Sequence, residues 1–188
     1  TLLDPAQLID YKPPRASVWA SDSEWDLLVS RMHTLGMVRP IDEDDIHRVN
    51  GQKVLSGAFA VPKSNGKLRL VCNMGCNGIM SRMSPHDADA LAHPCQFVSI
   101  LLDKGEIILV DEEDEVSCFF IYRMPPVWGS LFTLGKTVPA RVVGLQGDRP
   151  TFVCLNVIPM GWISAVDVLQ NIQRNLALTA GAGATAEI

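Results

Sequence analysis

The sequence has few cysteines, no excess of basic residues and no long uninterrupted apolar run, and each absence excludes a class of protein. Its five cysteines are odd in number and scattered, so they do not make the paired framework of a small secreted domain. The longest apolar stretch, residues 152–166, is interrupted by Asn156, Pro159 and Gly161, which excludes a membrane-spanning helix. We therefore expect reduced thiols, an intracellular location in the cytoplasm or nucleus, no secretion and no membrane partner.

The charge balance argues against a protein that binds nucleic acid with its whole surface, because the net charge is −5. A local basic cluster is compatible with this balance. Hydrophobic residues make up 47% of the chain, which is enough for a core and excludes disorder throughout. The N-terminus has neither a basic start nor an apolar signal core, and it lacks Met. We therefore expect a fragment or a processed piece of a longer protein.

Local patterns predict several helices and strands. Residues 21–24 have the spacing of a helix-capping box, and Gly36 supplies a stop, so we expect a helix over 22–35. The apolar positions of its inner face are Trp25, Leu28, Met32 and Leu35. The acidic run 42–45 predicts a solvated loop or helix start rather than a metal site. Further helices are expected at 87–91, 95–102 and 164–176, with strands at 107–110 and 152–158 and a short helix or irregular segment at 119–124.

A β-hairpin is predicted where two β-prone runs, 58–61 and 67–71, flank an Asn-Gly pair, because both residues tolerate positive φ. We find no internal repeat. The expected organisation is an extended lead segment (1–20), a first subdomain (21–94), a second subdomain (95–180) and a loose, low-complexity tail (181–188). The fold class is α+β, with an antiparallel sheet packed against helices.

Three segments carry a family resemblance when taken together and in order. They are Phe59-Ala60-Val61-Pro62-Lys63-Ser64-Asn65-Gly66-Lys67-Leu68-Arg69-Leu70-Val71, Asp114-Glu115-Val116-Ser117-Cys118-Phe119-Phe120-Ile121-Tyr122-Arg123-Met124-Pro125, and Asn156-Val157-Ile158-Pro159-Met160-Gly161-Trp162-Ile163-Ser164-Ala165 running into Gln170. This arrangement resembles the reverse transcriptase (RNA-directed DNA polymerase) family over about residues 22–176. The resemblance implies a right-hand polymerase fold, with 21–94 as fingers and 95–180 as an incomplete palm.

The second segment resembles the family's first catalytic block, which implies that Asp114 is a catalytic residue binding Mg²⁺ or Mn²⁺. Two such ions stabilise the entering and leaving oxygens of phosphoryl transfer. Phe119, five positions later, would screen the 2′ side of the incoming sugar and favour deoxynucleotides. A register with Asp111 as the ligand puts Val116 at the aromatic position and fits worse.

The other two segments imply contacts with substrate. The Pro-x-Gly-Trp segment resembles the block beside the nascent base pair, so Met160, Gly161 and Gln170 would line the template and nucleotide pocket. The hairpin resembles the fingers hairpin, so Lys63 and Arg69 would contact nucleotide phosphates. The implied partners are an RNA or DNA template–primer, deoxynucleoside triphosphates and the remainder of a retrotransposon-type polyprotein.

The sequence also departs from the family. Asn73 and Gly75 stand where an Asp and an Arg are common, and Asn77 is one place short of a common Asn. The second catalytic block, Tyr/Phe-x-Asp-Asp, is expected after the Gln170 helix, where this chain ends. We therefore expect no primer extension by the isolated chain with magnesium or manganese.

Two alternatives remain open at this stage. One is a catalytically inactive, polymerase-like remnant that serves as a binding or structural domain, which the departures at Asn73 and Gly75 favour. The other is a zinc module. Its ligands would be drawn from two close cysteines and three looser residues: Cys72, Cys76, His86, His93 and Cys95.

Overall fold

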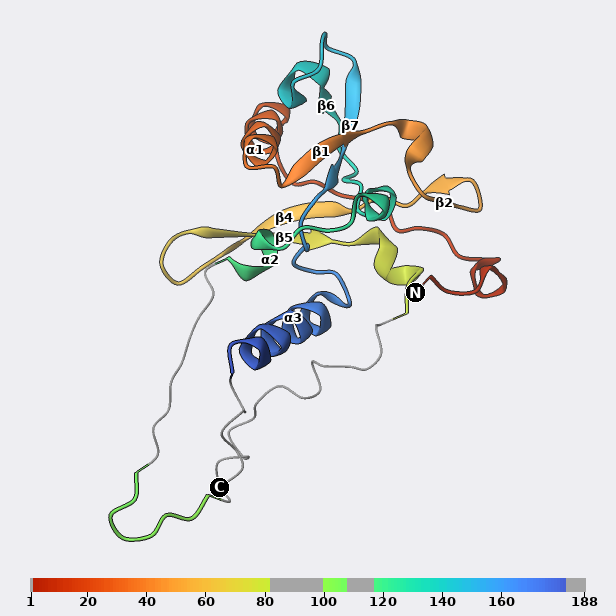
Figure 1. Cartoon of the computed structure of the whole chain (residues 1–188). Helices are drawn as coiled ribbons and strands as arrows, with labels where there is room; N and C mark the ends of the chain where they lie inside the picture. The colour runs from red at the N-terminus through yellow and green to blue at the C-terminus, as the bar shows by residue number, and fades with distance from the viewer. Residues whose placement is uncertain (1, 82–99, 108–116, 182–188) are drawn as a thin grey trace.

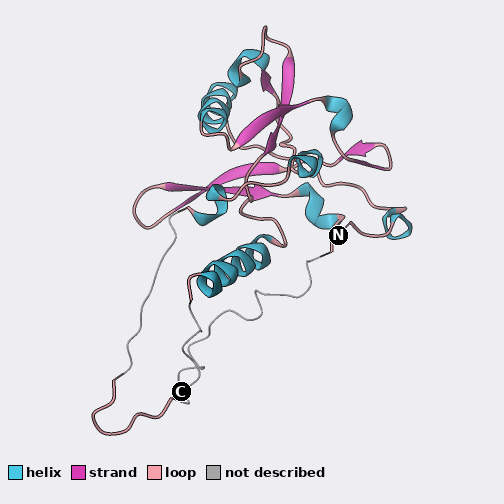
Figure 2. Ribbon diagram, viewed as in Figure 1, coloured by secondary structure: helices cyan, strands magenta, loops and turns pink. Residues whose placement is uncertain are grey.

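The protein is an α+β domain in which a small antiparallel sheet, a β-hairpin and two long helices surround one core (Figures 1 and 2). The computed structural model describes residues 2–81, 100–107 and 117–181. The helices are α1 (Asp22–Thr34), α2 (Cys118–Ile121) and α3 (Ala165–Thr179), and the strands are β1 (Val38–Ile41), β2 (Arg48–Val49), β3 (Gln52–Lys53), β4 (Gly57–Pro62), β5 (Leu68–Asn73), β6 (Val138–Pro139) and β7 (Pro150–Leu155). Short 3₁₀ turns lie at Pro5–Leu8, Glu43–Asp45, Gly75–Gly78, Pro126–Leu131 and Ala140–Val143.

The predicted first helix is confirmed as α1, together with its capping box. The backbone N–H of Ser21 donates to Glu24 at 2.9 Å, and that of Glu24 donates to the Ser21 hydroxyl at 3.3 Å. Its inner face differs from the prediction. Trp25, Val29 and Met32 are buried, and the two leucines of the expected face, Leu28 and Leu35, are exposed. Both sets have helical spacing, and the positions of β1, β6 and the 140–143 turn select the one containing Val29.

The sheet has the order β1-β7-β6, with both pairs antiparallel. β7 is its central strand, so Val153, Cys154 and Leu155 are fully or almost fully buried. The predicted strand 152–158 is confirmed over 152–155. Beyond Leu155 the chain leaves the sheet through a bridge between Val157 and Arg123. This exit carries the chain out of the sheet towards the start of α3.

The predicted hairpin is confirmed as β4 and β5, which pair from Gly57–Asn73 to Pro62–Leu68. The turn closes where the N–H of Lys63 donates to the carbonyl of Lys67 at 2.7 Å. Because side chains alternate along a strand, Ala58 and Cys72 face the core, and Phe59, Val61 and Arg69 face outwards. The outer edge of β4 is covered by a parallel bridge between Val18 and Ala58.

The lead segment lies against the body of the domain. The N–H of Leu3 donates to Ile79 at 2.9 Å, and the Asn50 amide donates to the carbonyls of Leu8, Ile9 and Tyr11. A Cβ added to Gly78 would lie 2.0 Å from the Tyr11 hydroxyl, so the ring rests directly on that glycine. The acidic run 42–45 forms the solvated 3₁₀ turn that was predicted, and its Glu43 pairs with Lys53 and Arg48.

The last described helix, α3, is confirmed with bounds close to the expected 164–176. Leu169 is buried and Val168 and Ile172 pack against the core, whereas Leu176 of the expected inner face is 56% exposed. The chain has left the core by that point of the helix. Across the described parts of the chain, no helix combines the length and apolar character needed to cross a bilayer. The expected helix 87–91, most of 95–102 and strand residues 108–110 lie outside the described residues, and 100–102 are not helical.

Candidate active site

The bend at residues 159–162 joins the strand segment after β7 to α3, and it packs against the β4–β5 hairpin. The N–H of Trp162 donates to the Pro159 carbonyl at 3.2 Å, and the N–H of Cys72 donates to the Met160 carbonyl at 2.8 Å. Gly161 has φ +114°, and a Cβ there would lie 2.0 Å from the Cys72 carbonyl oxygen. Only glycine fits this position, and the close approach that requires it is to the β5 backbone.

Asn77 holds the same bend from its other side. Its amide nitrogen donates to the Gly161 carbonyl at 2.8 Å, and its amide oxygen accepts from the N–H of Ile163 at 2.9 Å. One side chain thus satisfies two backbone groups at a turn that enters a helix. In the sequence, Asn77 was noted only as displaced from the family spacing. The signal that identifies it is the position of an amide side chain shortly after the hairpin.

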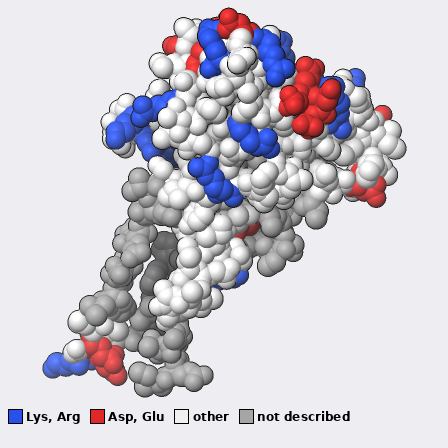
Figure 3. Space-filling view, turned by 45° about the horizontal axis from the view of Figure 1, so that its top comes forward, with Lys and Arg blue, Asp and Glu red and all other residues white. Residues whose placement is uncertain are grey.

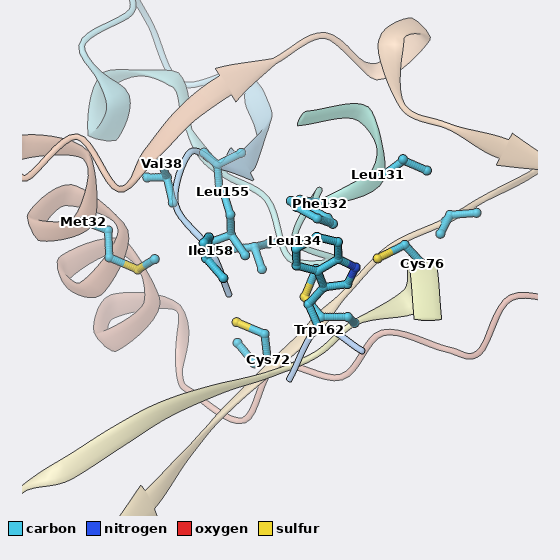
Figure 4. Close-up of a cluster of buried hydrophobic side chains, with 14 of the residues drawn as sticks. Met32, Val38, Cys72, Cys76, Leu131, Phe132, Leu134, Leu155, Ile158 and Trp162 are labelled. Carbon is cyan, nitrogen blue, oxygen red and sulfur yellow. The ribbon is translucent and has the colours of Figure 1, made fainter. Parts of the chain in front are cut away.

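Trp162 anchors the bend in the core. Its ring packs edge-on against Phe132 and Trp128, with both centroids at 5.4 Å, and the residue is 4% exposed. Figure 4 shows it among the buried side chains, beside Phe132 and Leu134. The indole N–H has no hydrogen-bond partner. The tryptophan therefore acts here through its packing.

The described part of the first catalytic block lies directly beside the strand segment that precedes the bend. Arg123 bridges Val157, the N–H of Met124 donates to Asn156 at 2.8 Å, and the N–H of Ile158 donates to Tyr122 at 3.2 Å. The predicted short helix is confirmed as α2, and its Phe119 is half-buried against the core. Asp114, Asp111 and Val116 lie outside the described residues.

Arg123 also connects this block to α1. Its guanidinium donates to the carbonyl of Gly36 and, at 3.5 Å, to that of Leu35. The Asn156 amide donates to the same Gly36 carbonyl at 3.3 Å. Carbonyls at a helix C-terminus carry partial negative charge, so a guanidinium is a suitable partner for them. The end of α1, the first block and the strand segment after β7 are thus held together.

Lys63 and Arg69 lie on the exposed end of the hairpin, and neither forms an ion pair among the described residues. Figure 3 shows Lys and Arg gathered at the left of the molecule, where the hairpin tip lies in Figure 1. Arg69 is three strand positions from Cys72, which is about 10 Å along the strand. The basic end therefore extends away from the bend on the element that the bend contacts.

Met160 is half-buried in the bend, and Gln170 is half-buried on α3. A mainly apolar pocket of about 250 Å³ lies between the first block, the bend and α3. Tyr122, Met124, Trp128, Ile158 and Trp162 are among its lining residues. The structure thus brings Met160 and Gly161 next to β5 and to the block of Phe119, whereas Lys63 and Arg69 lie further along the hairpin.

The cysteines of the zinc alternative are core residues where they are described. Cys72 and Cys76 are buried, and burial raises the pKa of each thiol to about 12. Zinc binds thiolates, which these environments disfavour. Within residues 2–81, 100–107 and 117–181, no group of three His, Cys, Asp or Glu side chains could hold a metal. His86, His93 and Cys95 lie outside the described residues.

We predict that these thiols make the protein alkali-sensitive. Burial raises the pKa of Cys72 from its ordinary 9.0 to about 12 and that of Cys154 to about 11. The unfolded chain therefore loses these protons first, so stability is full below about pH 9 and falls as the pH rises, by up to about 1.4 kcal/mol per thiol per pH unit. Urea denaturation at a series of pH values measures this. Cys72→Ala should lose less stability over the same range, and rapid labelling of native Cys72 by a thiol reagent would contradict the prediction.

The comparisons with known proteins support the fold. No protein-family model matches the chain, and no curated protein matches it in sequence. A solved structure of a foamy viral protease–reverse transcriptase in complex with double-stranded DNA is similar, with a TM-score of 0.56 and 11% identity. The similarity covers 88% of this chain and 25% of that one, so the chain spans about a quarter of that protein's length. At this identity the likeness shows a polymerase-like fold alone.

Proposed function

We propose that the chain is the fingers and partial palm of an RNA-directed DNA polymerase from a retrotransposon-type polyprotein, and that it binds template–primer. The observation that carries this proposal is the convergence of three segments that are far apart in the sequence. β5 bonds to the bend through Cys72 and Met160, and the first block bonds to the segment leading into that bend through Arg123 and Val157. The resemblance to reverse transcriptases rests on these same three segments.

In the proposed function each candidate residue has a role. Asp114 would hold Mg²⁺ or Mn²⁺ for nucleotidyl transfer, since magnesium prefers oxygen ligands. Phe119 would screen the sugar of a deoxynucleoside triphosphate, and Met160, Gly161 and Gln170 would line the template and nucleotide pocket. Lys63 and Arg69 would contact phosphates. The similar foamy viral enzyme was solved with double-stranded DNA, which supports nucleic acid as the partner.

Charge reversal on the hairpin tests the binding. We expect Lys63→Glu with Arg69→Glu to weaken template–primer binding by about tenfold or more at low salt, because phosphate contacts dominate such affinities. Fluorescence anisotropy with a labelled duplex measures this. Lys104→Glu, which makes a similar charge change on the 100–107 loop, is the matched control and should change the affinity little. Equal losses in the hairpin and control variants would show that only net charge matters and would contradict the proposal.

A catalytically inactive binding domain is the second candidate, and one contact favours it. A Cβ at Gly75 would lie 2.2 Å from the Leu55 carbonyl oxygen, and the N–H of Gly75 donates to the Ser56 hydroxyl at 3.2 Å. The backbone of Leu55 thus fills the space that a side chain would need where the family has Arg. Template–primer binding that is unchanged in Asp114→Ala and insensitive to magnesium would favour this candidate over a catalytic role.

A further inference from the structure

Trp19 exposes its indole although its backbone is fixed. The side chain is 85% exposed, whereas the N–H of Trp19 donates to Ala58 at 3.3 Å beside the bridge that covers β4. Trp25 and Trp162 are buried and Trp128 is half-buried. A large aromatic ring held rigidly in solvent is an uncompensated apolar surface that a ligand can cover.

Hollows lie on both sides of this indole. One, of about 600 Å³, is lined by Ser17, Trp19, Phe59, Ala60 and Asn73. The other, of about 570 Å³, is lined by residues 15–19 and 135–137. The two hollows share Ser17 and Trp19, so we treat them as one surface and name it the Trp19 groove. A second aromatic ring, Phe59, is 39% exposed within it.

The charge of the Trp19 groove is positive. Arg15 is exposed and makes no hydrogen bond or ion pair with any residue that the structure describes. Lys136 also lines the groove, but its amine donates to the Ala20 carbonyl and pairs with Asp22, both at 2.8 Å. Arg15 is therefore the cation available to a ligand at this end, and Arg69 lies on the same outer face of the hairpin as Phe59.

We infer that the Trp19 groove takes a single-stranded polynucleotide, with a base stacked on Trp19 and a phosphate at Arg15. Exposed aromatic rings beside cations suit this ligand, because every base has a face that stacks and every linkage carries a negative charge. The inference rests on the proposed function, since it requires that the chain binds nucleic acid. It adds a binding site built from residues 15–19 and 135–137, which lie outside the three segments of the resemblance.

Tryptophan fluorescence tests the stacking directly, since Trp19 is the exposed indole. We expect short single-stranded RNA or DNA to quench the fluorescence of the wild type, and Trp19→Ala to lose that quenching. Trp19→Ala should also weaken single-strand binding by about tenfold, with Trp19→Phe retaining most of the affinity. Leu27→Ala, which truncates another exposed apolar side chain, is the control and should bind like the wild type. Separate titrations with RNA and with DNA identify which polynucleotide is taken, and binding of either supports the inference.

Salt dependence tests the cation. Arg15→Ala should lower the slope of log affinity against log salt by about 0.7 for a single strand, and Arg31→Ala on α1 should leave it unchanged. A blunt duplex separates this inference from the proposed function. If the duplex binds but Trp19→Ala leaves single-strand affinity and quenching unchanged, the Trp19 groove is not the site. If the wild type binds neither duplex nor single strand, the proposed function fails as well.

Discussion

Gly161→Ala is expected to destabilise the protein by about 4 kcal/mol, because it combines a strained backbone with a collision that has no side-chain escape. The residue has φ +114°, which L side chains rarely adopt. The added Cβ would lie 2.0 Å from the Cys72 carbonyl oxygen, a backbone atom that cannot rotate away. The bend must therefore move off β5, which breaks the bond between Cys72 and Met160. Chemical denaturation followed by circular dichroism measures the loss.

Gly105→Ala is the matched control for this prediction. Gly105 has φ +97° and would place its Cβ in open space, so its substitution carries the backbone strain without the collision. We expect it to cost about 1 kcal/mol. Similar losses in the two variants would show that the contact between the bend and β5 contributes little, which would weaken the convergence on which the proposed function rests.

Trp162→Ala is expected to cost about 4 kcal/mol, which for a chain of this size lowers the melting temperature by about 10 °C. The variant loses the ring contacts with Phe132 and Trp128 and leaves a cavity at the centre of the core. Thermal unfolding followed by circular dichroism measures the effect.

Trp162→Phe separates packing from hydrogen bonding at the same position. The indole N–H is buried without a partner, so removing it relieves a desolvation cost of about 1–3 kcal/mol and offsets part of the lost packing. We therefore expect Trp162→Phe to lose at most about 1.5 kcal/mol. A loss as large as that of Trp162→Ala would mean that the N–H has a partner in solution, contrary to the packing role assigned to this tryptophan.

Local structure followed closely from local sequence. The capping box of Ser21 and Glu24 fixed where α1 begins, and the Asn65-Gly66 pair fixed the hairpin turn, because each depends on side chains within four residues of one another. The α+β class followed from such elements. The sequence also indicated which three segments belong together, although Asp114 and the first subdomain boundary at 94/95 lie outside the described residues, so these remain predictions.

The amino-acid sequence by itself determined where the chain turns helical or extended, since those choices depend on neighbouring side chains and backbone torsions. Only the tertiary structure decided which face each element buries and what each turn contacts. Val29 replaced Leu28 in the core because β1 and β6 lie on that side of α1, and Gly161 proved necessary because the β5 backbone passes against it. The Asn77 bonds to the bend likewise join residues more than 80 positions apart, and no local pattern of side chains encodes a contact of that range.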